Sequence, residues 1–374
     1  MTAGASVHGA LGKLPRGLRR EGEAFWRWAN AGEIGNAQMQ DLRNSTMRKV
    51  CAGLVFLATI ILPAIALAQK APDKPTIAVS ADPREGGTIW LIDPDGADQR
   101  AILDISGNPL PLGLAWSPDG RKLAFHTEVN GNVDIYVMNA DGRNLKQLTE
   151  APAEDSWPQW HPGNQRIIFT SDRDGNFEIY VMTAEGEVIE NLTDDPVIDI
   201  DPAWSPDGRS IVFSSKRGKT LGDLFVMDAN GENLLNLTNH RALDTQPKWS
   251  PDGSQILWTS HRDGTGDIFL MDADGGNAAK LNAFAAPRDH WEELEPTWSP
   301  DGGMVAYVTA GGGDSFIILA IAGADEAEQG RLQIGARTRS PAWFDPDFIG
   351  AFAVSPAAKR ILTWSWLKRV VHGN

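Results

Sequence analysis

The chain has 374 residues, with 49 acidic against 34 basic side chains and a formal net charge of −15 at pH 7. This acidic balance excludes nucleic acids and anionic membrane surfaces as favoured partners, because both require a basic footprint. Cys51 is the only cysteine, so no disulfide can form within the chain.

Residues 47–68 have the pattern of a secretory signal peptide. Met47 is followed by two basic residues, an apolar stretch runs from Val50 to Leu62, and Ala66-Leu67-Ala68 supplies a small-x-small end. We expect cleavage after Ala68, a periplasmic or secreted location, and no stable membrane span in the mature chain. An uncleaved anchor is the alternative, because the apolar run is about the length of a membrane span.

Residues 1–46 show no sustained hydrophobic period. We interpret them as a non-structural upstream segment or a mis-assigned start, with translation beginning at Met47. Removing residues 1–68 would make the chain more acidic, since that segment contains 8 of the 34 basic but only 4 of the 49 acidic residues. Cationic proteins, peptides or metal ions are the partners that such a charge favours.

A repeat with a period in the mid-forties follows, and we assign residues 75–355 to it. The phrase Trp-Ser-Pro-Asp-Gly and its worn copies occur six times, with steps of 44, 44, 45, 49 and 45 residues between the tryptophans. The six copies begin at Trp116, Trp160, Trp204, Trp249, Trp298 and Trp343. A period of this length is typical of propeller arrays.

The repeat from Asp199 to Thr238 shows the strands of one unit. An apolar run ending in Trp204 precedes the Pro-Asp-Gly turn, and two β-branched and aromatic runs follow, at 210–214 and 223–228. Residues 234–238 alternate like a half-exposed outer strand. Each repeat therefore predicts four short antiparallel strands, which make one propeller blade. Within the Trp phrase, we expect Pro, Asp and Gly to build a turn and Trp to wedge between blades.

A second phrase, of the type Ile-Tyr-Val-Met-Asp-Ala-Asp-Gly, also occurs six times. Its first copy precedes every Trp phrase, and the last Trp phrase has no copy after it. The halves pair only if residues 341–354 share a blade with residues 76–102, which also hides the open edges of the array. The sequence thus predicts an all-β, six-bladed propeller closed by its N- and C-terminal strands, with residues 356–374 as a C-terminal tail.

No catalytic residue can be assigned. The chain has no Gly-x-Ser-x-Gly elbow, and its Asp-rich turns lack the spacing of calcium loops. An enzyme is therefore the less favoured interpretation.

Acidic residues recur just before the blade tryptophans. Counted back from the Trp, position −5 is acidic in four consecutive blades and position −3 in two of them; the residues are Asp155, Asp199, Asp244 and Glu293, then Asp201 and Glu295. These positions belong to links that surround one mouth of the channel in a propeller. Clustered carboxylates repel one another unless a cation or a basic partner neutralises them. A cation- or peptide-binding mouth and a solvated rim with local caps are both open interpretations.

The longest step between tryptophans contains an insert, residues 284–295, with His290 and Trp291. Loops on rigid scaffolds often carry binding groups, so we include both residues in the candidate site. No cofactor is assigned; a divalent cation in the channel, Ca²⁺ or Mn²⁺, is the candidate that an acidic mouth would suit.

The repeated phrases, with Ser171-Asp172-Arg173-Asp174-Gly175, resemble the propeller repeats of the TolB family over residues 75 to 355. The resemblance implies a periplasmic component of the Tol-Pal envelope system, which receives a lipoprotein partner on its propeller. It also implies an α/β domain before the propeller, which we expect to be missing here because the repeats begin about ten residues after the expected cleavage site.

Two functional hypotheses follow. The first is an exported scaffold that binds a basic protein or peptide partner through the acidic channel mouth. The alternative is a metal-dependent, lyase-like propeller enzyme that acts on a sugar or small ligand at the channel mouth.

Overall fold

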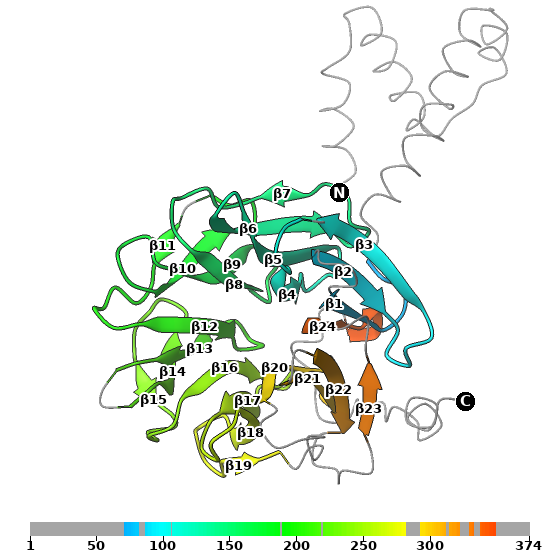
Figure 1. The fold of residues 1–374 in the computed structure, drawn as a ribbon. Helices are drawn as coiled ribbons and strands as arrows, with labels where there is room; N and C mark the ends of the chain where they lie inside the picture. Colours follow the sequence, from blue (N-terminus) through cyan, green and yellow to red (C-terminus); the bar gives the residue numbers. More distant parts are fainter. Residues whose placement is uncertain are drawn as a thin grey trace, which may run out of the picture. The chain divides into compact units, whose positions relative to one another are not determined.

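The computed structural model describes residues 71–81, 87–105, 107–187, 189–217, 220–281, 292–311, 314–321, 329–332 and 337–348. These residues form six four-stranded sheets arranged around a centre (Figure 1). The predicted six-bladed propeller is therefore confirmed. The expectations for residues 1–46, 47–68 and 356–374, and for His290 and Trp291, lie outside the described residues.

The first and the last described strands meet in blade 1, as the repeat halves predicted. From the innermost strand outward, blade 1 contains β24 (Thr338–Phe344), β1 (Thr76–Ala81), β2 (Gly87–Ile92) and β3 (Gln99–Ile105). Strand β24 pairs antiparallel with β1, and a short 3-10 helix, Pro346–Phe348, follows it. The C-terminal strand thus supplies the innermost position of the blade that the N-terminal strands begin.

The other five blades use four consecutive strands each. Blade 2 contains β4 (Leu112–Trp116), β5 (Lys122–Val129), β6 (Asn132–Asn139) and β7 (Lys146–Gln147). Blade 3 contains β8 (Asp155–Trp160), β9 (Arg166–Ser171), β10 (Glu178–Thr183) and β11 (Glu190–Asn191). Blade 4 contains β12 (Asp199–Trp204), β13 (Ser210–Ser215), β14 (Asp223–Asp228) and β15 (Leu235–Asn236).

Blade 5 contains β16 (Asp244–Trp249), β17 (Gln255–Ser260), β18 (Asp267–Asp272) and β19 (Ala279–Lys280). Blade 6 contains β20 (Glu292–Trp298), β21 (Met304–Gly311), β22 (Asp314–Ile321) and β23 (Gln329–Leu332). Each innermost strand contacts the innermost strands of the blades before and after it, so the ring closes around a central channel.

The hydrophobic core lies between blades. Trp204 of blade 4, for example, packs with Ile168 and Ile179 of blade 3 and with Phe213 of its own blade. The indole N–H of Trp116 donates to the carbonyl of Ala342 across a blade boundary, at 3.1 Å. The tryptophans therefore wedge between blades, as the sequence predicted.

The Pro-Asp-Gly segment forms the expected turn. Asp119 accepts the hydroxyl of Ser117 at 2.7 Å and the backbone N–H of Arg121 at 3.1 Å, and Gly120 adopts φ 66°. The same bonds recur at Asp207, Asp252 and Asp301. The turn thus has the same construction in every complete copy of the phrase.

Within the described residues, no helix is long and apolar enough to cross a membrane.

Candidate functional site

Three of the four acidic residues at position −5 are buried ion-pair partners. Asp155, Asp199 and Asp244 are each fully buried, and each bonds to an arginine of its own blade. Arg173 donates to both carboxylate oxygens of Asp155, at 2.9 and 3.1 Å. Arg262 lies 2.9 Å from Asp244, and Arg217 pairs with Asp199 in the same way.

The arginines come from the turn after the second strand of each blade, and Arg173 and Arg262 lie over aromatic rings. The guanidinium carbon of Arg262 is 5.3 Å from the ring centroids of both Trp258 and Phe269. A buried carboxylate needs such a partner to offset its loss of hydration. These pairs therefore stabilise the blades, and the expectation that the three aspartates also contact a partner stays a prediction.

Glu154 and Glu292, one residue before position −5, are exposed acids at this end of the channel. Successive side chains of a strand point in opposite directions, so the residue before a buried position faces outward. We use the name acidic mouth for this end of the channel, with Glu154, Asp155, Asp199, Asp244, Glu292 and Glu293.

Glu293 has a separate structural role. Its side chain is 5% exposed and accepts the backbone N–H of Ile268 at 3.2 Å. In blades 2 to 4, the hydroxyls of Thr149, Thr193 and Thr238 accept the corresponding N–H. Burial raises the pKa of Glu293 to about 7. Blade 5 thus takes its capping group from the neighbouring blade.

Position −3 of every innermost strand adopts a left-handed backbone conformation. The values of φ lie between 51° and 62° in all six blades, and the residues are Gly113, Trp157, Asp201, Gln246, Glu295 and Ser340. The pairing register shifts beside each of them, as in a β-bulge. We call these six residues the central belt. A bulge re-aims a side chain, and here all six residues line one cavity in the channel.

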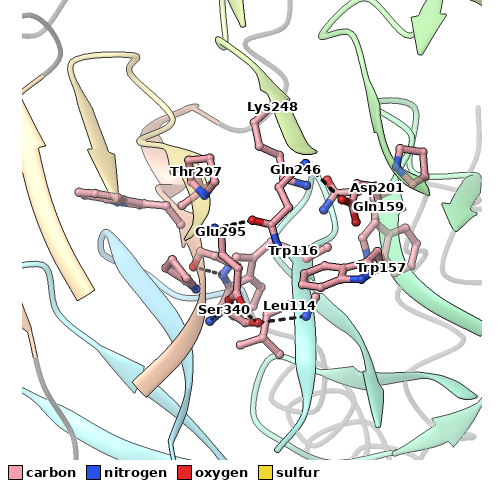
Figure 2. Close-up of a pocket in the computed structure, with 18 residues that line it drawn as sticks. Leu114, Trp116, Trp157, Gln159, Asp201, Gln246, Lys248, Glu295, Thr297 and Ser340 are labelled. Atoms are coloured by element: carbon pink, nitrogen blue, oxygen red, sulfur yellow. Dashed lines mark hydrogen bonds between the residues drawn. The ribbon is translucent and has the colours of Figure 1, made fainter. Parts of the chain in front are cut away.

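Hydrogen bonds link the central belt from blade to blade (Figure 2). The backbone N–H of Gln246 donates to Asp201 at 3.2 Å, and that of Glu295 donates to Oε1 of Gln246 at 2.8 Å. The N–H of Ser340 donates to Glu295 at 2.6 Å, and that of Gly113 donates to the hydroxyl of Ser340 at 3.1 Å. Four consecutive blade boundaries are thus closed by the same interaction.

The remaining two boundaries use substitutes, because neither Gly113 nor Trp157 offers an acceptor side chain. The N–H of Trp157 donates to Nδ1 of His126 at 3.2 Å, and the N–H of Asp201 donates to the hydroxyl of Thr170 at 3.2 Å. A Cβ at position 113 would lie 2.9 Å from Nδ1 of His126, which explains the glycine there. His126 therefore supplies the acceptor for the N–H of Trp157 that Gly113, without a side chain, cannot supply.

The two acids of the central belt differ in how they are neutralised. Glu295 accepts bonds from the Arg339 guanidinium and from both the N–H and the hydroxyl of Ser340. Asp201 uses Oδ2 for the N–H of Gln246, while its Oδ1 has no hydrogen-bond partner among the described residues. Burial raises the pKa of Asp201 to about 6, against the opposing effect of Lys248.

Lys248 is the basic side chain among the described residues that line this cavity, beside the acids Asp201 and Glu295. Figure 2 shows it beside Gln246 and opposite the side of the cavity where Ser340 lies. Within the described part of the chain, no hydrogen bond or ion pair holds its ammonium group. Burial lowers the pKa of Lys248 to about 8, although Asp201 and Glu295 act in the opposite direction.

The channel contains two adjoining cavities. The first, of about 190 Å³, is lined by the central belt with Gln159, Lys248 and Thr297. The second, of about 260 Å³, is lined by the six blade tryptophans and by the prolines of the Trp phrases. We call this end the tryptophan mouth. The two cavities share lining residues, among them Gln159, Lys248 and Thr297.

The worn copies of the Trp phrase contribute rings at this end. His161 replaces the serine of blade 3, and its ring lies 4.7 Å from that of Trp204 in an edge-on contact. Phe344 replaces the serine of blade 1 and lies 5.5 Å from the ring of Trp116. Both substitutions therefore add contacts to the next blade.

The sequence analysis identified Asp201 and Glu295 as channel residues, and both line the first cavity. It missed Gln159, Gln246 and Lys248, which lie at positions −1 and −3. The bulge at position −3 interrupts the alternation of the innermost strand, so the sequence pattern did not identify them. No group of three or more His, Cys, Asp or Glu side chains among the described residues is arranged to hold a metal ion.

Curated proteins similar to parts of this chain carry the TolB name. The family model described as the TolB beta propeller domain matches residues 70–190 and 200–349. The Tol-Pal system protein TolB of Thioalkalivibrio sulfidiphilus is 39% identical over 69 residues, which are 17% of this chain and 15% of that protein. That of Syntrophus aciditrophicus is 42% identical over 52 residues, or 14% of this chain and 12% of that protein. The matches to these curated relatives thus span only a small part of their length.

Two solved structures have the same fold. TolB from Acinetobacter baumannii is 24% identical, with a TM-score of 0.62 over 76% of this chain and 69% of that one. A putative TolB from Agrobacterium tumefaciens is 18% identical, with a TM-score of 0.56 over 75% of this chain and 96% of that one. At these identities the structures show the fold alone. The family match covers most of the chain, and the chain belongs to the TolB beta propeller domain family.

Proposed function

We propose that this chain is an exported, TolB-like propeller scaffold that binds a protein or peptide partner through the acidic mouth. Membership of the TolB beta propeller domain family carries the proposal, together with the naming of the curated relatives as Tol-Pal system proteins. The signal-peptide pattern at residues 47–68 supports a periplasmic location.

The acidic mouth offers a partner a rigid surface. Its buried Asp–Arg pairs fix the start of the innermost strands in blades 3, 4 and 5. Glu154 and Glu292 are exposed beside them, on a chain whose net charge is −15. Exposed carboxylates on an acidic protein favour a basic partner and raise its rate of association at low salt.

The test is capture of partners from an envelope extract by the immobilised chain, at low and at high salt. The wild type is compared with the double variant Glu154→Gln/Glu292→Gln. The matched control is Glu185→Gln/Glu187→Gln, which removes two exposed acids near the outer edge of blade 3 and leaves the same net charge.

We expect one basic protein to be retained by the wild type and the control at low salt, and to be lost from the double variant. Equal retention by all three chains would contradict a role for the acidic mouth. Elemental analysis of the same samples tests the enzyme alternative, which requires stoichiometric Mn²⁺ or Ca²⁺ that is lost on Asp201→Asn.

A further inference from the structure

Asp201 and Lys248 are two oppositely charged groups that line one cavity and form no ion pair with each other. The rest of the central belt is satisfied, since Gln246, Glu295 and Ser340 all accept a backbone N–H from the next blade. Asp201 is 8% exposed and Lys248 is half-buried, so water reaches both groups only from the cavity, and a charge with so little hydration gains from an oppositely charged partner. Oδ1 of Asp201 and Nζ of Lys248 are therefore available to a ligand.

The cavity limits the size of that ligand. Its volume of about 190 Å³ corresponds to roughly six water molecules at about 30 Å³ each. A volume of this size suits a small molecule. Gln159, Thr297 and the amide nitrogen of Gln246 add hydrogen-bonding groups to the wall, and Trp157 adds an aromatic surface.

The second cavity, at the tryptophan mouth, indicates the chemistry of the part of the ligand that lies beyond Lys248. Lys248, Gln159 and Thr297 border both cavities, so a molecule bound at Lys248 also reaches the second one. That second cavity is lined by the indole and proline rings of the Trp phrases, which suit an apolar group.

We propose that the channel binds a free α-amino acid with an apolar side chain, entering by the tryptophan mouth. Its carboxylate accepts from the Lys248 ammonium, its ammonium donates to Oδ1 of Asp201, and its side chain lies among the tryptophan and proline rings. A zwitterion is the chemical class that satisfies both unpaired charges at once. This site is separate from the acidic mouth, so it stands or falls independently of the proposed partner.

Isothermal titration calorimetry at pH 7 on the full chain tests the proposal, with L-leucine as the probe. We expect saturable one-to-one binding that is weaker for glycine, which has no apolar side chain. L-leucinamide lacks the carboxylate and N-acetyl-L-leucine lacks the ammonium, so each should bind at least about tenfold more weakly, as expected for the loss of a hydrogen bond to a charged group.

Two variants locate the site. Asp201→Asn keeps an oxygen for the N–H of Gln246 but removes the charge, and Lys248→Met keeps the length of the side chain. Each should weaken leucine binding at least about tenfold. Glu187→Gln and Lys216→Met, at exposed positions, are the matched controls and should bind like the wild type. Thermal melting establishes that each variant is folded before titration.

Titration against pH gives a second readout. Affinity should be greatest near pH 7 and fall below pH 6 and above pH 8, because burial raises the pKa of Asp201 to about 6 and lowers that of Lys248 to about 8. The other charged groups facing them are Glu295 and Arg339, which bond to each other. No saturable heat with leucine, equal binding of N-acetyl-L-leucine, or unchanged affinity in folded Asp201→Asn and Lys248→Met would each overturn the proposal.

Discussion

The backbone N–H of Glu295 donates to Oε1 of Gln246, 2.8 Å away, across the boundary between blades 6 and 5. The side chain of Glu295 then accepts the N–H of Ser340 in blade 1. One residue thus links three blades at the centre of the ring, and it does so from a left-handed backbone conformation with φ 55°. Such backbone positions persist only where the surrounding structure holds them, so the belt is where the blades are locked together.

Replacing Gln246 tests the belt bond directly. Gln246→Leu keeps the size of the side chain but leaves the N–H of Glu295 without its acceptor. We expect a loss of about 1–3 kcal/mol in the free energy of unfolding, the usual cost of a buried, unsatisfied donor. Urea denaturation measures it, with Gln159→Leu as the control, because the Gln159 side chain lines the same cavity but makes no belt bond. Equal losses in both variants would show that the belt bond contributes nothing.

Glu295 should be more sensitive than Gln246. Its carboxylate is 4% exposed and compensates the guanidinium of Arg339 as well as the N–H of Ser340. Glu295→Ala should destabilise the propeller by about 1–3 kcal/mol or more, because it leaves the buried N–H of Ser340 without its acceptor and the half-buried guanidinium of Arg339 without its partner. The double variant Glu295→Ala/Arg339→Met should recover part of that loss. If thermal and urea unfolding of the double variant show no recovery, the ion pair is not the cause.

The buried pair of Asp155 and Arg173 permits a double-mutant cycle. Arg173→Met leaves the fully buried Asp155 carboxylate without its partner, so we expect a loss of about 3 kcal/mol. The double variant Arg173→Met/Asp155→Asn also removes the unpaired charge. Its loss of stability should be smaller than the sum of the two single losses by more than about 0.5 kcal/mol, which is the coupling energy. Purely additive effects in urea denaturation would contradict the structural role given to the acids at position −5.

His126 should make the propeller sensitive to acid. Burial lowers its pKa to about 3, below the value of about 6.5 expected in the unfolded chain. The unfolded chain therefore takes up the proton first, and the stability that neutral His126 contributes is lost as the pH falls from about 6.5 toward 3, by up to about 1.4 kcal/mol per pH unit. Because Asp201 and Glu293 also titrate, the quantity to measure is the difference between wild type and His126→Asn. A difference that does not change with pH would exclude the effect.

The fold could be predicted from the sequence because the repeat encodes one blade at a time. The period between tryptophans, the buried strands such as 210–215, and the unpaired half repeats at the two ends specify six blades and their closure. Each expectation rests on local turn chemistry and on strand alternation, which the tertiary structure does not override.

The site was predicted only in part, for two physical reasons. The sequence pattern suggested that the acids at position −5 form a surface cluster. An arginine lies 18 residues after each of Asp155, Asp199 and Asp244, however, and it neutralises that aspartate within the blade. Glu293 has glycine at that spacing, Gly311, and is bonded differently. The recurring interval between aspartate and arginine was visible in the sequence and is the signal that distinguishes structural from free acids.

The central belt had no such signal. Only Gly113 and Asp201 among its six residues are of types enriched at positive φ, so nothing in Trp157, Gln246 or Ser340 indicates the bulge. The bulge depends on a bond to the preceding blade, which is a contact between positions about 45 residues apart. Lys248 lies two residues after the bulge at Gln246 and lines the cavity, but in the sequence it could not be distinguished from an ordinary surface lysine.

Photo-crosslinking in an envelope extract tests most directly whether a partner docks at the acidic mouth. A photoreactive phenylalanine analogue is placed at position 292, in the acidic mouth, or at position 146, on the exposed outer strand of blade 2. We predict a single protein adduct at position 292 that high salt suppresses, and none at position 146. Adducts of equal yield at both positions, or an adduct at position 146 alone, would contradict the account.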